Sequence, residues 1–230
     1  MFLKILTRKE LSLASKHVIT YEIDKRIVPV AKEYLAGCKN VEIINQDFLK
    51  SDIDVIAFGT TPIKIVANIP YYITTPIIEK IIQLNKIHQV ESATLTVQRE
   101  FAERMVAKPG TKSYGSFSIF VNFYTEPGIS LNIPKTAFLP QPDVGSAVIV
   151  LKIRQKPIVD ILDEKAFFDT VRSSFGQRRK TLRNSLSQKF EFSAIDIALE
   201  KAGIDPKKRG ETLRIEDFAK LSNELYQAKL

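Results

Sequence analysis

Short apolar runs rich in β-branched residues alternate with stretches of helical periodicity over the first hundred residues. The runs predict strands at 18–21, 41–44, 63–66 and 93–97. The stretches between and after them predict helices at 24–36, 75–85 and 99–107. Alternation of this kind favours an α/β fold with a largely parallel, doubly wound sheet. Such sheets bind ligands at the carboxyl ends of their strands.

The pattern changes twice further along the chain. After Lys108-Pro109-Gly110 it predicts antiparallel strands at 116–124, 128–133 and 147–153. Beyond Gln155-Lys156-Pro157 helical periodicity dominates, with helices predicted at 164–175, 178–188, 193–202 and 214–228. We therefore predict two domains, an α/β domain over residues 1–155 and a small all-helical domain over residues 156–230.

Composition narrows the class of protein. The chain has 230 residues, of which 44% are hydrophobic and 26% charged. No apolar run approaches the roughly 18 residues of a membrane span, and no signal peptide is expected. The single cysteine, Cys38, excludes an internal disulfide, and His17 and His88 have no partners at ligand spacing. We expect a reduced, cytoplasmic, metal-free monomer.

The chain is basic, with a formal net charge of +8 and a pI of about 9.4. Excess positive charge favours a polyanionic partner, but it specifies no sequence. Basic proteins without a nucleic-acid role are common, so charge alone leaves the partner open.

Polar residues follow three successive predicted strands. Glu22, Asp47 and Asn68 lie just past strands 18–21, 41–44 and 63–66. In a doubly wound fold these positions converge on one crevice. A carboxylate in the position of Glu22 suits the hydroxyls of a ribose. A carboxylate in the position of Asp47 can accept a hydrogen bond from an exocyclic amine such as adenine N6. The alternative is that acidic residues end strands because loops are solvated.

Asn68-Ile69-Pro70-Tyr71 suggests chemistry on an exocyclic amine. The lone pair of such a nitrogen is delocalised into its ring, so acceptors must hold its two hydrogens and stabilise the charge that develops. The Asn68 side-chain oxygen and the Ile69 carbonyl would supply them. Pro70 restricts Ile69 to an extended conformation, and Tyr71 offers a flat face for an extruded base. The alternative is a strand-ending asparagine followed by a proline turn.

The segment from Val66 to Pro76 resembles motif IV of the RNA adenine dimethyltransferases. That superfamily comprises the small-subunit (KsgA-type, 16S) ribosomal RNA enzymes and the erythromycin-resistance enzymes acting on large-subunit RNA. Further stretches resemble the first group, at 98–104 with 108–115, at 138–144, at 175–183 and at 209–213. The resemblance runs from about Leu6 to the end of the chain.

The resemblance implies a Rossmann-like methyltransferase domain that uses S-adenosylmethionine. Glu22, with Ile23 beside it, would hold the cofactor ribose, Asp47 its adenine N6, and the Phe48 backbone its ring edge. Asn68 would face both methyl donor and target, and Tyr71 and Phe138 would sandwich the target adenine. The family methylates N6 of two adjacent adenines, twice each, in the 3′-terminal hairpin of small-subunit ribosomal RNA during ribosome biogenesis.

Two basic stretches lie in the predicted helical domain. Their members are Arg178, Arg179, Lys180 and Arg183, followed by Lys207, Lys208 and Arg209. Helical spacing predicts Arg179 and Arg183 on one face, suited to phosphates. A solvated charged face is the alternative. With the resemblance, we expect RNA contact.

The sequence departs from the family at its start. Members carry a first strand and a G-x-G-x-G loop before a Leu-Thr pair, which Leu6-Thr7 resembles. Only Met1–Ile5 precede this pair here, and they contain no glycine. We therefore expect an N-terminally truncated form that lacks the central first strand and binds cofactor weakly.

Four hypotheses follow. The first is an active small-subunit ribosomal RNA adenine-N6,N6 dimethyltransferase, acting on the immature small subunit. The second is a catalytically impaired RNA-binding assembly factor with the same fold. The third is a large-subunit enzyme of the erythromycin-resistance type, against which the helical C-terminal segment argues. The fourth, a DNA adenine methyltransferase, leaves that segment unexplained.

Overall fold

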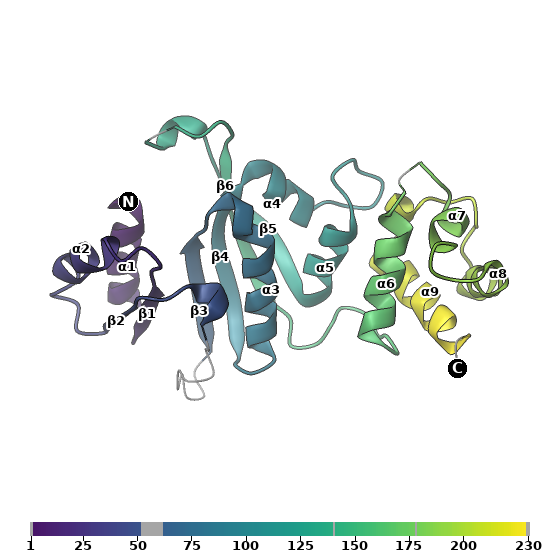
Figure 1. The fold of residues 1–230 in the computed structure, drawn as a ribbon, viewed down its shortest axis with the longest axis horizontal. Coiled ribbons are helices and arrows are strands. Elements are labelled where there is room, and N and C mark those ends of the chain that lie inside the picture. The colour runs from purple at the N-terminus through teal and green to yellow at the C-terminus, as the bar shows by residue number, and fades with distance from the viewer. Residues whose placement is uncertain (1, 52–61, 140, 178, 229–230) are drawn as a thin grey trace. The chain divides into compact units, whose positions relative to one another are not determined.

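The computed structural model describes residues 2–51, 62–139, 141–177 and 179–228, with side chains from Thr7 onward (Figure 1). The chain divides into two compact units. The first comprises Met1–Thr61 with Tyr72–Gln89, and the second comprises Pro62–Tyr71 with Val90–Leu230. The predicted boundary at residue 155 is a different division and stays a prediction.

The first unit holds a two-stranded parallel sheet and its helices. Strands β1 (Val18–Tyr21) and β2 (Val41–Ile44) pair in register from Val18 opposite Val41 to Tyr21 opposite Ile44. The short 3-10 helix η1 (Phe48–Lys50) follows β2. The α-helices are α1 (Phe2–Ala14), α2 (Ile27–Tyr34) and α3 (Thr74–Asn85). Helix α1 was not predicted, although its leucine, lysine and alanine residues favour helix.

The second unit contains a four-stranded sheet in the order β3-β4-β6-β5. Strands β3 (Ile63–Asn68) and β4 (Val90–Gln98) are parallel, whereas β5 (Thr125–Ile133) and β6 (Ser146–Ile153) pair antiparallel. Ala93, Leu95 and Val97 of β4 are fully buried, as expected of an inner strand. The change from parallel to antiparallel pairing agrees with the change in sequence pattern after residue 110. No described strand joins this sheet to the β1-β2 pair.

The strand predicted at 116–124 is wrong, because those residues form helix α5 (Ser116–Tyr124). Ile119 and Phe123 lie four residues apart and are both buried, which is one face of a helix. The Gly115 N–H donates to Ser118 Oγ at 3.1 Å where the helix begins. Burial of this face in an aromatic core therefore overrides the strand propensity of its phenylalanines and valine. Helix α4 (Arg99–Met105) agrees with its prediction.

The C-terminal part of the second unit is helical (green to yellow in Figure 1). Its helices are α6 (Glu164–Phe175), α7 (Leu182–Leu186), α8 (Phe192–Ala202) and α9 (Ile215–Gln227), with the 3-10 turn η5 (Gly210–Thr212) between the last two. Their core continues into α5, since Phe167 and Phe218 cluster with Phe123. The Tyr114 hydroxyl donates to Leu213 O at 2.9 Å, and burial raises the pKa of this phenol.

Asp169 of α6 anchors a charged cluster on this core. Its carboxylate accepts from Lys165 Nζ at 2.8 Å and Arg172 Nη2 at 2.7 Å, and Lys189 Nζ lies at 2.6 Å. Burial alone would raise the pKa of Asp169, but hydrogen bonds from these cations outweigh it and hold the pKa well below its ordinary value. The ionised carboxylate therefore stabilises the folded state.

Replacing Asp169 with asparagine is expected to lower the free energy of unfolding at pH 7 by about 1–2 kcal/mol, because the cationic partners are largely exposed. A carboxylate with a depressed folded pKa contributes stability above its unfolded pKa of roughly 3.9 and loses it as pH falls toward the folded value. The difference between the two proteins should therefore shrink below pH 4. Urea unfolding across pH 2.5–7 measures it, and a difference independent of pH would contradict this assignment.

Candidate active site

The carboxyl end of β3 defines one edge of the four-stranded sheet. Asn68 is the last residue of β3 and lies opposite Thr96 of β4. At the same edge Gln98, Ser146 and Ile133 are in register across β4, β6 and β5. The loop from 134 to 145 therefore leaves and re-enters the sheet at the edge where β3 ends (Figure 1). Phe138 is on this loop, just after the 3-10 turn η4 (Lys135–Ala137), and its approach to Asn68 stays a prediction.

The Asn68-Ile69-Pro70-Tyr71 segment is fixed by contacts within the second unit. Ile69 is buried, and Pro70 is exposed after it. The Tyr71 hydroxyl and Ser146 Oγ are hydrogen-bonded at 2.7 Å. Ser146 is completely buried at the start of β6, so this bond ties the Tyr71 side chain to the sheet. The Tyr71 ring is therefore anchored to the sheet, two residues after the buried Ile69, and the role of this segment toward a base stays a prediction.

Glu22 follows β1 in the first unit and is buried. Its N–H donates to Ile44 O at 3.0 Å, and Asn45 Nδ2 donates to its carbonyl at 2.7 Å, which fixes its backbone. Arg8 Nη2 donates to Oε2 at 2.9 Å, and the Asp24 N–H donates to Oε1 at 3.2 Å. Sequence reasoning missed this buried ion pair. Arg8 and Ser12, spaced four apart, share the buried side of α1, but their burial is visible only in the structure, so the sequence carried no signal for this pair.

Asp47 and Phe48 lie near the same edge of the β1-β2 pair. Tyr21 and Ile44 are in register, so the residues that follow each strand leave the sheet together. Asp47 Oδ1 accepts from the Leu49 N–H at 3.0 Å and so caps η1. The Phe48 ring packs edge-on against Tyr21, with ring centroids 5.5 Å apart. Ile23, next to Glu22, is 68% exposed.

This acceptor set fits the adenosine half of S-adenosylmethionine. A carboxylate has about four lone-pair sites. The two bonds on Glu22 and the one on Asp47 leave capacity for ribose hydroxyls and an exocyclic amine. Glu22 and Asp47 belong to one unit and Asn68 to the other, so their convergence on one crevice stays a prediction.

Arg183 of α7 is engaged in contacts inside the helical part. Arg183 Nε and Nη2 donate to the two carboxylate oxygens of Asp196 at 2.5 and 2.7 Å, and its guanidinium lies 4.4 Å from the centre of the Phe192 ring. Helix α7 begins only at Leu182, after the capping residue Thr181. The prediction that Arg179 and Arg183 share a helix face is therefore wrong, because Arg179 lies in the preceding turn. Arg178 lies outside the described residues.

The remaining predicted basic residues meet at the start of α7. The Leu182 N–H donates to Lys208 O at 2.7 Å, which joins the second basic stretch to the end of the first. The side chains are all exposed and are called the basic corner here: Arg179, Lys180, Lys207, Lys208 and Arg209. The sequence predicted both stretches separately, and the fold brings them together.

The single cysteine and His17 have local contacts. Cys38 is half-buried and accepts a hydrogen bond from Ser12 Oγ at 3.3 Å, and His17 Nε2 lies 3.7 Å from Glu42 Oε2. Within the described residues, no three histidine, cysteine or acidic side chains gather as metal ligands would. None of the described helices combines the length and apolar character needed to cross a membrane.

Comparison with known proteins gives consistent matches. A family model described as "Ribosomal RNA adenine dimethylase" matches residues 4–227. Two curated relatives named "Ribosomal RNA small subunit methyltransferase A", from Bacillus mycoides (strain KBAB4) and Bacillus cereus (strain AH187), are each 45% identical over 96% of this chain and 78% of their own length.

Two solved structures resemble the fold. A dimethyladenosine transferase from Plasmodium falciparum has a TM-score of 0.77 and 27% identity, covering 94% of this chain and 84% of its own. The 23S rRNA methyltransferase ErmE has a TM-score of 0.71 and 26% identity, covering 95% of this chain and 86% of its own.

Proposed function

Because this chain belongs to the ribosomal RNA adenine dimethylase family, we propose that it transfers methyl groups from S-adenosylmethionine to N6 of adenines in small-subunit ribosomal RNA. The Rossmann-like methyltransferase fold and the enzyme class expected from the sequence are confirmed by the family match and by the Plasmodium falciparum structure. The observation that carries the proposal is the Asn68–Tyr71 segment at the end of β3, with Tyr71 anchored to Ser146. The proposed targets are two adjacent adenines of the 3′-terminal hairpin, each dimethylated.

The residues at the end of β3 would activate the target amine. The Asn68 side-chain oxygen and the Ile69 carbonyl would accept its two hydrogens and draw the nitrogen toward tetrahedral geometry. They would also stabilise the positive charge that develops as the nitrogen is methylated. Tyr71 and Phe138 would hold the base between their rings. The methylated ammonium is acidic enough to lose its proton to water, so no general base is required.

The cofactor, when bound, supplies an electrophilic methyl group. Glu22 would accept the ribose hydroxyls, with Arg8 keeping its carboxylate in place, and Ile23 would border the sugar. Asp47 would accept a hydrogen bond from the adenine N6 amine, and the Phe48 backbone would contact the edge of the adenine ring. These roles rest on the resemblance and on the acceptor capacity of the two carboxylates.

The proposed partner is the immature small ribosomal subunit, and we propose that this protein binds it in the cytoplasm as a monomer. Large-subunit ribosomal RNA is the alternative substrate that a test must separate. The likeness to ErmE covers 95% of the chain, so fold alone does not separate the two RNA substrates. The 45% identity to small-subunit enzymes favours the small subunit.

Methyl transfer from tritiated S-adenosylmethionine tests the proposal. The purified chain is expected to label ribosomal RNA in immature small subunits and to leave large-subunit RNA unlabelled. Labelling of large-subunit RNA instead would assign the protein to the resistance branch. Subunit binding without labelling would identify a non-enzymatic assembly factor.

Replacing Lys207 and Lys208 together with alanine is expected to weaken RNA binding and reduce its dependence on salt. Each lost phosphate contact lowers the slope of log K against log salt by about 0.7–0.9. Filter binding to small-subunit RNA at several salt concentrations measures this slope. Lys220→Ala, which removes an exposed lysine outside the basic corner, is the control. An unchanged slope in the double variant would remove the corner from the RNA interface.

A further inference from the structure

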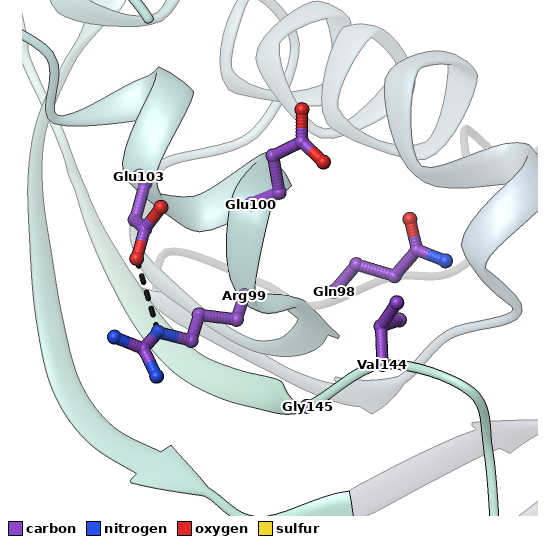
Figure 2. Close-up of a pocket in the computed structure, with 6 residues that line it drawn as sticks. All are labelled: Gln98, Arg99, Glu100, Glu103, Val144 and Gly145. Atoms are coloured by element: carbon purple, nitrogen blue, oxygen red, sulfur yellow. Dashed lines mark hydrogen bonds and ion pairs between the residues drawn. The ribbon is translucent and has the colours of Figure 1, made fainter.

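A recess of about 490 Å³ opens between the start of α4 and the end of the loop preceding β6. Its lining residues are Gln98, Arg99, Glu100, Glu103, Val144 and Gly145 (Figure 2). The Arg99 N–H donates to Gly145 O at 3.0 Å, and Arg99 Nε donates to Glu103 Oε1 at 3.0 Å. The first bond joins the two walls, and the second lies within α4. The recess is largely open to solvent.

The recess adjoins the proposed target-base position. Gln98 lies opposite Ser146 in the β4-β6 register, and Val144 and Gly145 immediately precede Ser146 in the chain. Ser146 Oγ is bonded to the Tyr71 hydroxyl at 2.7 Å. One residue therefore connects the recess to the ring on which the target adenine would stack. A group bound in the recess would neighbour that adenine.

The lining favours a base with an exocyclic amine. Gln98 presents a carboxamide, which offers the donor and acceptor that match the N7 and N6 edge of adenine. In Figure 2, Gln98 and Val144 stand on one side and the paired Arg99 and Glu103 on the other. Val144 is 45% exposed and gives an apolar surface for a ring. Two carboxylates against one guanidinium make the lining net negative, which disfavours a phosphate and favours amine hydrogens.

We propose that this recess binds the unpaired adenine next to the target adenine in the RNA. The site would fix which of two adjacent bases enters between Tyr71 and Phe138. This inference rests on the proposed function for the identity of the RNA, and on the recess for the contact.

Binding of hairpin RNA tests the site without turnover. One fluorescent hairpin carries two adjacent adenines, and a second carries purine, which lacks the 6-amino group, in place of the neighbouring adenine. We expect the wild-type protein to bind the first hairpin about 5- to 100-fold more tightly by fluorescence polarisation, the range for loss of one bidentate base contact. Gln98→Ala is expected to bind both hairpins equally and as weakly as the wild type binds the second. Gln83→Ala, an exposed glutamine of α3, should keep the wild-type preference.

The outcomes separate the recess from the function. Equal binding of both hairpins by the wild-type protein would overturn the recess site, as would a Gln98→Ala protein that keeps the preference. Neither result would contradict the proposed function, which is tested separately by methyl transfer to immature subunits. A preference that depends on Gln98 in a protein that transfers no methyl group would keep the site and refute the proposed activity. Melting temperatures of both variants should match the wild type, because Gln98 makes no side-chain cap on α4.

Discussion

Asn68→Ala is expected to lower methyl transfer to immature small subunits by about 10²–10³-fold or more, the cost of removing one preorganised acceptor from a developing charge. The side-chain oxygen is the group that we assign to the amine hydrogens, and its loss leaves the Ile69 carbonyl alone. Asn68 ends β3 and its backbone stays in register with Thr96, so the fold should be retained. Single-turnover methylation with tritiated cofactor measures the rate, and thermal unfolding checks the fold.

Two further variants sharpen this test. Asn68→Asp keeps an acceptor oxygen and is expected to retain more activity than Asn68→Ala. Asn132→Ala removes an exposed asparagine from β5 and should leave the rate unchanged. An Asn68→Ala variant that methylates the subunit as fast as the wild-type protein would exclude Asn68 from the chemistry. The assignment of the end of β3 as the active site would fall with it.

Periodic segments of the chain were predictable because the spacing of their hydrophobic residues is a local signal that can be read from the sequence. The strands at 18–21 and 41–44 have the predicted bounds, and the helix predicted at 164–175 is α6 to the residue. Helix α5 was missed because its aromatic and β-branched residues favour strand locally. Only packing of Ile119 and Phe123 into the helical core decides in favour of helix, and that packing is non-local.

Candidate site residues were predictable in type and chain position but not in their partners. Register places Asn68 at the sheet edge that also carries Gln98, Ser146 and Ile133, and the roles of Asn68, Tyr71 and Phe138 stay predictions. The Arg8 contact to Glu22 joins residues 14 apart and depends on how α1 packs against β1, which no local pattern states. The same is true of Arg183, whose bidentate contact to Asp196 replaces the free cation that its spacing suggested.

The second large effect concerns Gly210, in the Arg209–Leu213 stretch that resembles the family. Gly210 is buried at the start of η5 against the last turn of α6. A Cβ added there would lie 2.6 Å from the Ser174 carbonyl oxygen and 3.1 Å from Ser174 Cβ. The first contact is with backbone, which cannot rotate away as a side chain can. The glycine is therefore needed for close approach of two backbones, not for an unusual φ angle.

Gly210→Ala is expected to lower the free energy of unfolding by about 1–3 kcal/mol, the usual cost of overpacking. For a chain of this size that is a fall of roughly 2–12 °C in Tm, measured by calorimetry. Gly37→Ala is the matched control, because a Cβ at Gly37 meets no atom within 4 Å, and its Tm should change little. An equal Tm for wild type and Gly210→Ala would mean that η5 yields readily. Any shift of η5 that relieves the contact would also move Arg209 of the basic corner, which directly precedes Gly210, so RNA binding should weaken in Gly210→Ala even below its melting temperature.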